Sequence, residues 1–319
     1  MATTSSSPID TNYAEYQKAF QMYQSYIRSK NANWIYRWIF GSICYNHACS
    51  DAYNLIQPPL NYFKTTNDLD KYLQCLLLKL DIEKEIYERS CIATLCELGQ
   101  YYTTNKSVAN YKKAIDYYEQ AIDYCIQYDN KRIFPVYEKI INIHTQYDDD
   151  DISSGAKVIE ICELLTDKYS HILSDRQTET VLTILADKYI ADGNFFQAFI
   201  CYNKCEQVLS DKKFRSDFNY TKYARLAILC LLAQNKIDTA METYVNYCNS
   251  NVSLMRSSIG VQIESIIRSI RNNSIDDYVD LFKHHNHGGD KNELLLIDRI
   301  KNVCFISLDD NDNDNDDIR

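Results

Sequence analysis

The chain has 319 residues, enough for two ordinary domains or for one elongated repeat domain. Its formal net charge of −10 argues against nucleic acid as a partner, because the phosphate backbone attracts basic surfaces. With only seven Gly and four Pro, and no alternating apolar run bounded by turn residues to indicate a sheet, the chain is predicted to be all-α.

The N-terminal residues 1–12 are polar and are expected to be disordered. An amphipathic helix is predicted over residues 13–29, because apolar side chains recur there at helical spacing. Its apolar side is formed by Ala19, Tyr23, Tyr26 and Ile27.

Residues 31–47 are unusual, because they hold both tryptophans of the chain. No Asp or Glu occurs between Glu15 and Asp51, whereas four basic residues do. The apolar run is much shorter than the roughly 20 residues that span a bilayer. Aromatic side chains with basic neighbours suit the headgroup region of an anionic membrane, although packing in the core of the first hairpin is the alternative. The candidate membrane-contact residues are Trp34, Ile35, Trp38, Ile39 and Phe40.

The middle of the chain contains further breaks and helices. Pro58 and Pro59 are expected to interrupt helical structure before a helix around residues 73–80. Pro135 is expected to lie at the start of another helix. Four consecutive aspartates in residues 148–155 are interpreted as a solvated run beside a helix start, since a calcium loop would need a terminal glutamate. Other helices are predicted over residues 136–147, 156–169, 256–271 and 293–304.

A motif of small and aromatic residues recurs along the chain. In residues 98–125 it predicts two helices joined at the polar turn TTNKSV, and residues 185–205 repeat it. Small and aromatic residues spaced by three and four let neighbouring helices approach closely, as in tetratricopeptide-type hairpins. Three degenerate copies predict a solenoid over residues 13–250 that binds a partner. The packing residues are Leu98, Gly99, Tyr102, Ala114, Tyr118 and Ala121, then Leu185, Ala186, Tyr189, Ala198 and Tyr202, and finally Ala240, Tyr244 and Tyr247.

Sequence signatures of catalysis are missing. No glycine-rich phosphate loop, nucleophile elbow or metalloprotease helix occurs. His284, His285 and His287 form one cluster of possible metal ligands, but adjacent histidines in a glycine-containing loop more often bind metal adventitiously. We therefore expect no enzyme activity, no cofactor and no metal.

Twelve cysteines are scattered along the chain without a Cys-x-x-Cys pair. Several, such as Cys205, fall at inward-facing helix positions where a small apolar residue is needed. With no signal peptide recognised, we expect reduced, buried thiols in a cytosolic protein, with a zinc site or a disulfide scaffold as the alternatives.

The order of these features resembles the soluble NSF attachment proteins, the alpha and gamma SNAP adaptors. The resemblance extends from about residue 13 to the C-terminus, and the co-linear order of its motifs makes it specific. The matching segments are LGQYY and YKKAIDYYEQAIDYC (residues 98–102 and 111–125), FFQAFICYNKC (195–205), ARLAILCLL (224–232), SIDDYVDLFKHHN (274–286), LLLIDRIKN (294–302) and the final DDIR.

This resemblance implies a twisted sheet of helical hairpins followed by a C-terminal helical bundle over residues 251–306 and an acidic, flexible tail over residues 307–319. It implies binding to a SNARE four-helix bundle and stimulation of the hexameric AAA ATPase NSF. Residues 31–47 correspond to the hydrophobic loop that the family inserts into membranes, which implies a cytoplasmic protein peripheral to membranes. The residues implied to contact NSF are Asp316, Asp317, Ile318 and Arg319.

The chain also departs from the family pattern. Two lysines that the family uses against SNARE acids correspond to Ala93 and Ile184, although Lys188 lies one turn from Ile184. These changes weaken the prediction of SNARE and NSF as partners more than the prediction of the fold. A scaffold for another helical partner, or a SNAP mimic acting as a decoy, therefore remains the alternative. The positions corresponding to family acids that face NSF are Lys222, Arg271 and Asn272.

Overall fold

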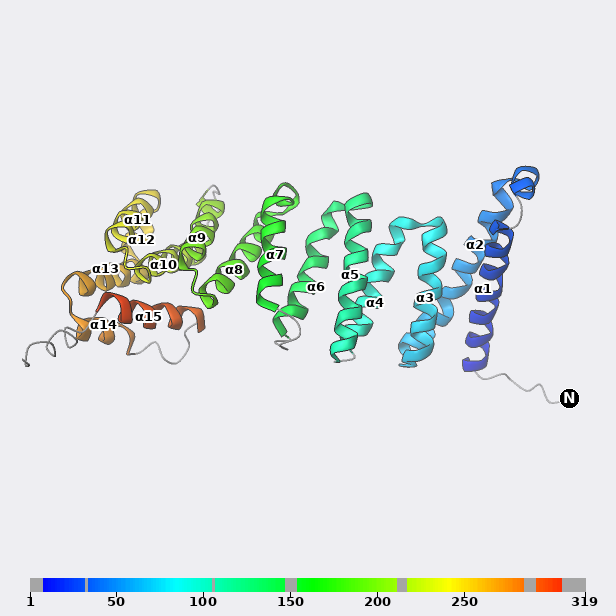
Figure 1. Cartoon of the computed structure of the whole chain (residues 1–319), viewed down its shortest axis with the longest axis horizontal. Helices are drawn as coiled ribbons and strands as arrows, with labels where there is room; N and C mark the ends of the chain where they lie inside the picture. The colour runs from blue at the N-terminus through cyan, green and yellow to red at the C-terminus, as the bar shows by residue number, and fades with distance from the viewer. Residues whose placement is uncertain are drawn as a thin grey trace, which may run out of the picture. The chain divides into compact units, whose positions relative to one another are not determined.

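The computed structural model describes residues 8–31, 34–104, 107–146, 154–210, 217–283 and 291–305 (Figure 1). These ranges contain fifteen α-helices and no strand, which confirms the prediction of an all-α chain. The chain divides into two compact units, residues 1–147 and 148–319. The division falls inside the solenoid predicted over residues 13–250, so each unit is described by itself.

The first unit is a series of helices in which each packs against the next along the chain. Helix α3 is capped by Asp68 and α5 by Ser107, whose side chains accept hydrogen bonds from backbone N–H groups of the first turn. Such caps and short turns bring consecutive helices back beside each other. The helices are α1 (Pro8–Asn31), α2 (Trp34–Thr65), α3 (Leu69–Ile86), α4 (Cys91–Thr104), α5 (Val108–Tyr128) and α6 (Ile133–Gln146), with short 3-10 turns η1 (Glu88–Ser90) and η2 (Asn130–Arg132).

The second unit also begins with helices that each pack against the next along the chain, but its last helix packs against helices from earlier in the unit. Helix α15 packs against α8 and α10, and Arg225 of α10 forms an ion pair with Glu293 of α15. The Tyr278 hydroxyl of α14 donates to the Ile297 carbonyl of α15 at 2.8 Å. The helices are α7 (Ser154–Asp167), α8 (Asp175–Ala191), α9 (Phe195–Ser210), α10 (Asp217–Leu232), α11 (Ile237–Ser250), α12 (Val252–Arg256), α13 (Ser258–Arg271), α14 (Ile275–Phe282) and α15 (Lys291–Cys304), with the 3-10 turn η3 (Ser170–Ile172).

Helix α1 begins at Pro8, before the start predicted at Tyr13. Proline suits the first helical position, because its φ angle is preset and its missing N–H has no partner there anyway. The Asn12 side chain also donates to the Pro8 carbonyl at 2.7 Å. The expectation of disorder over residues 1–12 is therefore wrong for residues 8–12.

Helix α2 contradicts two expectations. It begins at Trp34, so residues 34–47 of the expected hydrophobic loop are helical. It also continues through Pro58 and Pro59, although an interior proline costs about 3 kcal/mol or more by removing a backbone hydrogen bond. The burial of Ile56, Leu60 and Phe63 on both sides of the proline pair opposes that cost and keeps the helix continuous.

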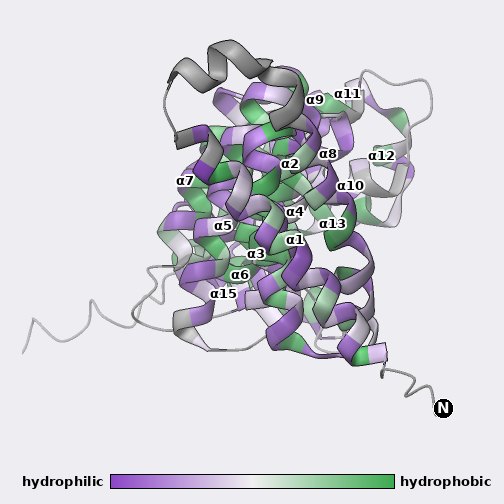
Figure 2. Ribbon diagram, turned by 90° about the vertical axis from the view of Figure 1, so that its right-hand side faces the viewer, coloured by the Kyte–Doolittle hydropathy of each residue, from purple (hydrophilic) through white to green (hydrophobic). Residues whose placement is uncertain are grey.

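Tyrosines occupy much of the core within each unit, and each helix presents both hydrophilic and hydrophobic residues (Figure 2). Tyr118, Tyr202, Tyr220 and Tyr278 are among the largest fully buried side chains. A buried phenol needs a partner for its hydroxyl, and Tyr220 donates to the Tyr247 carbonyl at 3.1 Å. The tyrosines thus combine a large apolar area with directional hydrogen bonds between helices.

Glu83 of α3 is a buried carboxylate, with 1% of the side chain exposed. Its Oε1 lies 3.8 Å from the Lys79 Nζ, and Thr94 of α4 and Tyr53 of α2 also interact with it. Burial raises the pKa of Glu83 above its ordinary value, although the neighbouring Thr94 hydroxyl and the charge of Lys79 oppose this increase.

We predict that Glu83→Gln flattens the dependence of stability on pH. Because the pKa of Glu83 is raised in the native state, that state binds the proton more tightly than the unfolded chain does. The Glu83 contribution to the free energy of unfolding therefore increases as pH falls from neutral through the raised pKa. Thermal unfolding between pH 7 and pH 4.5 should show this increase for the wild type and a smaller one for Glu83→Gln.

The matched control is Glu138→Gln, which changes an exposed carboxylate in the same unit. It should retain the wild-type pH dependence. Parallel pH profiles for Glu83→Gln and the wild type would contradict the assignment.

Candidate functional site

The first candidate binding element is the hairpin of α4 and α5, which is held by one very close contact. A Cβ atom added at Gly99 of α4 would lie 2.6 Å from the Cε1 and Cζ atoms of Tyr118 of α5. Ala114 and Ala121, one turn before and after Tyr118, are fully buried. The small residues therefore let the Tyr118 ring pack directly on the α4 backbone.

The hairpin of α8 and α9 repeats this arrangement with slightly larger residues. Ala186 and Ala198 are fully buried, and Tyr202 is 1% exposed. The Tyr202 hydroxyl donates to Asp187 Oδ1 at 2.9 Å, and the Tyr189 hydroxyl donates to Glu163 of α7. Two helix contacts are thus fixed by hydrogen bonds as well as by packing.

The third copy uses its tyrosines to reach neighbouring helices. Ala240 is fully buried, and both Tyr244 and Tyr247 are 5% exposed. The Tyr244 hydroxyl donates to the Gly260 carbonyl at 3.1 Å, and the Tyr247 hydroxyl donates to Asn203 Oδ1 at 2.8 Å. Leu98 and Leu185 of the first two copies are also buried, whereas Tyr102 is half-buried and stacks on Tyr117.

The structure describes the side chains of eleven of the twelve cysteines, and these eleven are free thiols, eight buried and three partly buried. Cys125, Cys162 and Cys205 occupy fully buried positions between helices. Burial raises the pKa of Cys205 to about 12, which keeps this thiol protonated and poorly nucleophilic at neutral pH. Within the described residues, no cluster of three or more His, Cys, Asp or Glu side chains could hold a metal ion.

The candidate membrane-contact residues lie at the start of α2. Trp34, Ile35, Trp38, Ile39 and Phe40 occupy its first two turns, and their side chains are outside the described residues. Lys18 and Arg28 of α1 are exposed, and Lys30 forms an ion pair with Glu85 of α3. None of the described helices combines the length and the apolar character needed to cross a bilayer.

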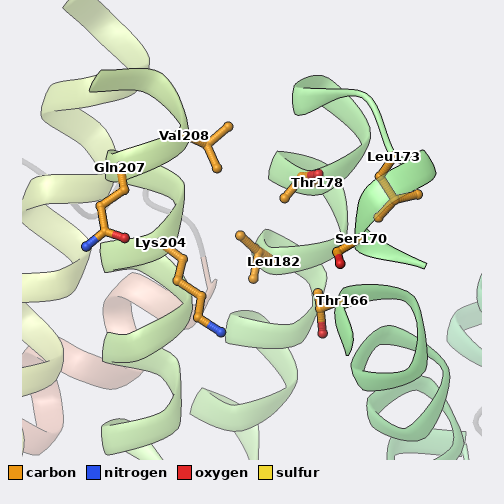
Figure 3. Close-up of a pocket in the computed structure, with 8 residues that line it drawn as sticks. All are labelled: Thr166, Ser170, Leu173, Thr178, Leu182, Lys204, Gln207 and Val208. Carbon is orange, nitrogen blue, oxygen red and sulfur yellow. The ribbon is translucent and has the colours of Figure 1, made fainter. Parts of the chain in front are cut away.

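A pocket of about 260 Å³, which the sequence did not reveal, lies among α7, η3, α8 and α9 (Figure 3). Lys204 extends from α9 toward the side of the pocket that carries Thr166 and Ser170. One cation with several hydroxyl groups suits a carboxylate or phosphate group, but the lining has no carboxylate, imidazole or thiol for acid–base or nucleophilic chemistry. The lining residues are Thr166, Ser170, Leu173, Thr178, Leu182, Lys204, Gln207 and Val208.

The structure locates the positions at which the sequence resemblance implies departures from partner-binding charges. Ala93 is exposed, and Ile184 and Lys188 are half-buried on α8. Arg271 forms an ion pair with Asp238 at 3.1 Å. Lys222 is exposed, with its Nζ 6.0 Å from the centroid of the Tyr223 ring, and Asn272 caps the C-terminus of α13.

Two sets of predicted residues lie outside the part of the chain that the structure describes. They are the histidines at positions 284, 285 and 287, and the tail residues Asp316, Asp317, Ile318 and Arg319.

Neither a family model nor a curated protein sequence matches the chain.

We predict that Gly99→Ala destabilises the first unit. The added methyl group would meet the Tyr118 ring, and because this ring is 1% exposed, moving it aside would disturb the side chains packed around it. Overpacking costs about 1–3 kcal/mol, which at its lowest only cancels the gain of about 1 kcal/mol from the higher helix propensity of alanine, so a net loss of up to about 2 kcal/mol is expected. Chemical denaturation should show the loss as a lower midpoint.

Gly155→Ala is the matched control, because no heavy atom lies within 4 Å of a Cβ atom added there in α7. Stability should be unchanged or slightly higher in that variant. Equal effects of the two substitutions would mean that the Gly99–Tyr118 contact is not tight.

Proposed function

We propose that this chain is a non-enzymatic adaptor of the SNAP type. In this role it binds a SNARE four-helix bundle, then recruits and stimulates an NSF-type AAA ATPase for SNARE disassembly in membrane fusion and vesicle transport. The observation that carries the proposal is the order of the packed hairpins α4–α5 and α8–α9 along the chain. The small residues of both hairpins are buried together with Tyr118 and Tyr202, as the proposed hairpin packing requires.

The fold that we propose for this adaptor is a tetratricopeptide-like solenoid with a C-terminal helical bundle. In such a fold each hairpin supports its neighbours, and the exposed faces of successive hairpins form an extended binding surface. The contact between α15 and helices α8 and α10 supports a closed C-terminal bundle, because it ties the last helix to the preceding hairpins. Such a bundle offers a second binding region, at which the ATPase is expected to dock.

The N-terminal hairpin supplies the proposed contact with an anionic membrane surface. Residues 16–50 contain no acid, and Lys18 and Arg28 on α1 are exposed. Because an acid-free surface is not repelled by anionic lipid, aromatic residues at the start of α2 can reach the headgroup region. The protein is thus proposed to be cytoplasmic and peripheral to membranes.

A second candidate function is a tetratricopeptide-like scaffold, or a SNAP mimic, that binds a different helical partner. The charges of the chain favour it. Ala93 and Ile184 provide no cation for acidic SNARE residues, and Arg271 is paired with Asp238. A protein with these charges could retain the helical fold while losing one of the two SNAP partners.

The proposed function predicts that the purified chain binds a SNARE complex, recruits NSF to it and raises NSF ATPase activity. A pull-down with both partners, followed by phosphate-release measurements, tests each step. Failure to bind either partner would favour the scaffold. Binding to SNAREs without stimulation of NSF would favour the mimic.

The same assay tests the tail with Ile318→Ala. The acidic tail has little apolar surface apart from Ile318 near its end, so this side chain is expected to supply the apolar contact with the ATPase, while the acids are attracted to a basic patch. Ile318→Ala should retain SNARE binding and stimulate NSF less than the wild type. Asn313→Ala, in the same tail, is the control; full stimulation by both variants would assign the tail no role beyond solubility.

We predict that replacing Trp34, Trp38 and Phe40 by Ser abolishes flotation with anionic liposomes. Their apolar area contributes roughly 25 cal/mol per Å² when buried in lipid, and each nearby cation adds about 1 kcal/mol. Circular dichroism should remain helical.

The control replaces two exposed leucines of α3, Leu69 and Leu77, by Ser, which should leave flotation unchanged. If the triple variant unfolds instead, these aromatic side chains pack in the core of the first hairpin.

A further inference from the structure

The most exposed large apolar side chains in the described part of the chain lie close together in sequence, in the second unit. Val252 is 56% exposed, Met255 54% and Val261 56%. They belong to the short helix α12 and the first turn of α13, which follow α11 (Figure 1). Exposed apolar side chains grouped in this way are typical of interaction surfaces.

The charge of this region differs from that of the chain. Residues 243–263 contain no Asp or Glu, whereas about three would be expected from the 44 acids among the 319 residues. The one charged residue in the segment is Arg256, which is exposed. The segment between Glu242 and Glu264 is thus apolar and weakly basic, and the exposed Glu264 that follows it is paired with Arg268 at 2.8 Å.

The backbone beneath these side chains is tightly held. Leu254 is fully buried, and a Cβ atom added at Gly260 would lie 2.0 Å from the Leu254 carbonyl oxygen. The Ser257 hydroxyl donates to that carbonyl at 2.7 Å and accepts from the Gly260 N–H at 3.0 Å. The Tyr244 hydroxyl donates to the Gly260 carbonyl at 3.1 Å. The apolar side chains therefore project from a fixed turn, and their exposure does not reflect a loosely packed end.

We propose that Val252, Met255, Arg256 and Val261, here called the α12 surface, contact an anionic lipid bilayer. The aliphatic side chains would enter the boundary between headgroups and acyl chains, and Arg256 would pair with lipid phosphate. Lipid is favoured over a protein partner because a projecting turn inserts into a bilayer without a matching shape, whereas a protein would need a pocket for each side chain. This contact is separate from the one proposed at the start of α2.

The two tryptophans of the chain make a direct test possible. In a background of Trp34→Phe and Trp38→Phe, Met255→Trp places the one indole of the protein on the α12 surface. Vesicles of phosphatidylcholine and phosphatidylserine with doxyl-labelled lipid should quench its fluorescence and shift it to shorter wavelength. Val279→Trp is the matched control, because Val279 is also exposed but lies on α14 near Asp276, Asp277 and Asp280.

Stronger quenching at position 255 than at position 279 would support the proposal. Equal quenching at the two positions would overturn it. Absence of quenching at either position would also overturn it where the variants still float with the vesicles, and that result would favour a protein partner. Neither outcome depends on NSF or SNARE binding, so failure of the SNAP-type function would leave this test unaffected.

A second experiment measures the contribution of the α12 surface in the full chain with both tryptophans present. Val252→Ser with Met255→Ser should lower partitioning onto the same vesicles roughly tenfold, since two apolar side chains lose their burial in lipid. Ile275→Ser with Val279→Ser, on α14, should leave partitioning unchanged. Unchanged partitioning of the first variant, with an unchanged circular dichroism spectrum, would overturn the proposal.

Discussion

The close approach of paired helices at small residues is the constraint on which each hairpin depends. Gly99 leaves space for the Tyr118 ring against the α4 backbone, and Ala186 and Ala198 are fully buried between α8 and α9. Because the part of the chain that the structure describes has no strands to link neighbouring segments through backbone hydrogen bonds, side chains must fix the spacing of its helices. Tyrosine does this well, because its ring fills the space and its hydroxyl reaches a specific acceptor such as Asp187.

Much of the helical structure could be predicted from the sequence, because breakers are scarce and apolar residues recur at helical spacing. Predictions from helix-breaking residues were wrong where the burial of apolar side chains outweighed the cost of the breaker. Proline predicts a break at positions 58 and 59, yet the core contacts of Ile56, Leu60 and Phe63 keep α2 continuous. The start of α1 is not marked by apolar periodicity, because residues 8–12 bury little surface. The preference of proline for the first turn of a helix was the one local signal for a start at Pro8.

The candidate sites were harder to predict than the fold. Val252, Met255 and Val261 resemble core residues in the sequence, as do Leu254 and Ile263 beside them, and only the fold shows which of these side chains are exposed. The pocket beside Lys204 could not be predicted either, because residues 166–208 approach one another only after α7, α8 and α9 have packed. The tryptophan segment was recognisable because its composition alone is unusual.

The distribution of charge along the chain bears on how an acidic protein could contact anionic lipid. A chain with a net charge of −10 is repelled by anionic lipid, and acids near a contact surface would oppose binding most strongly, since screening limits their effect to about 10 Å at moderate salt. Residues 16–50 and 243–263 both lack acids, and both carry apolar side chains with basic neighbours. The last eleven residues hold six of the 44 acids and one Arg, which is half of the net charge of −10. Separating the charges in this way would let an acidic protein contact anionic lipid through either of two limited segments, while its acidic tail would be attracted to a basic partner.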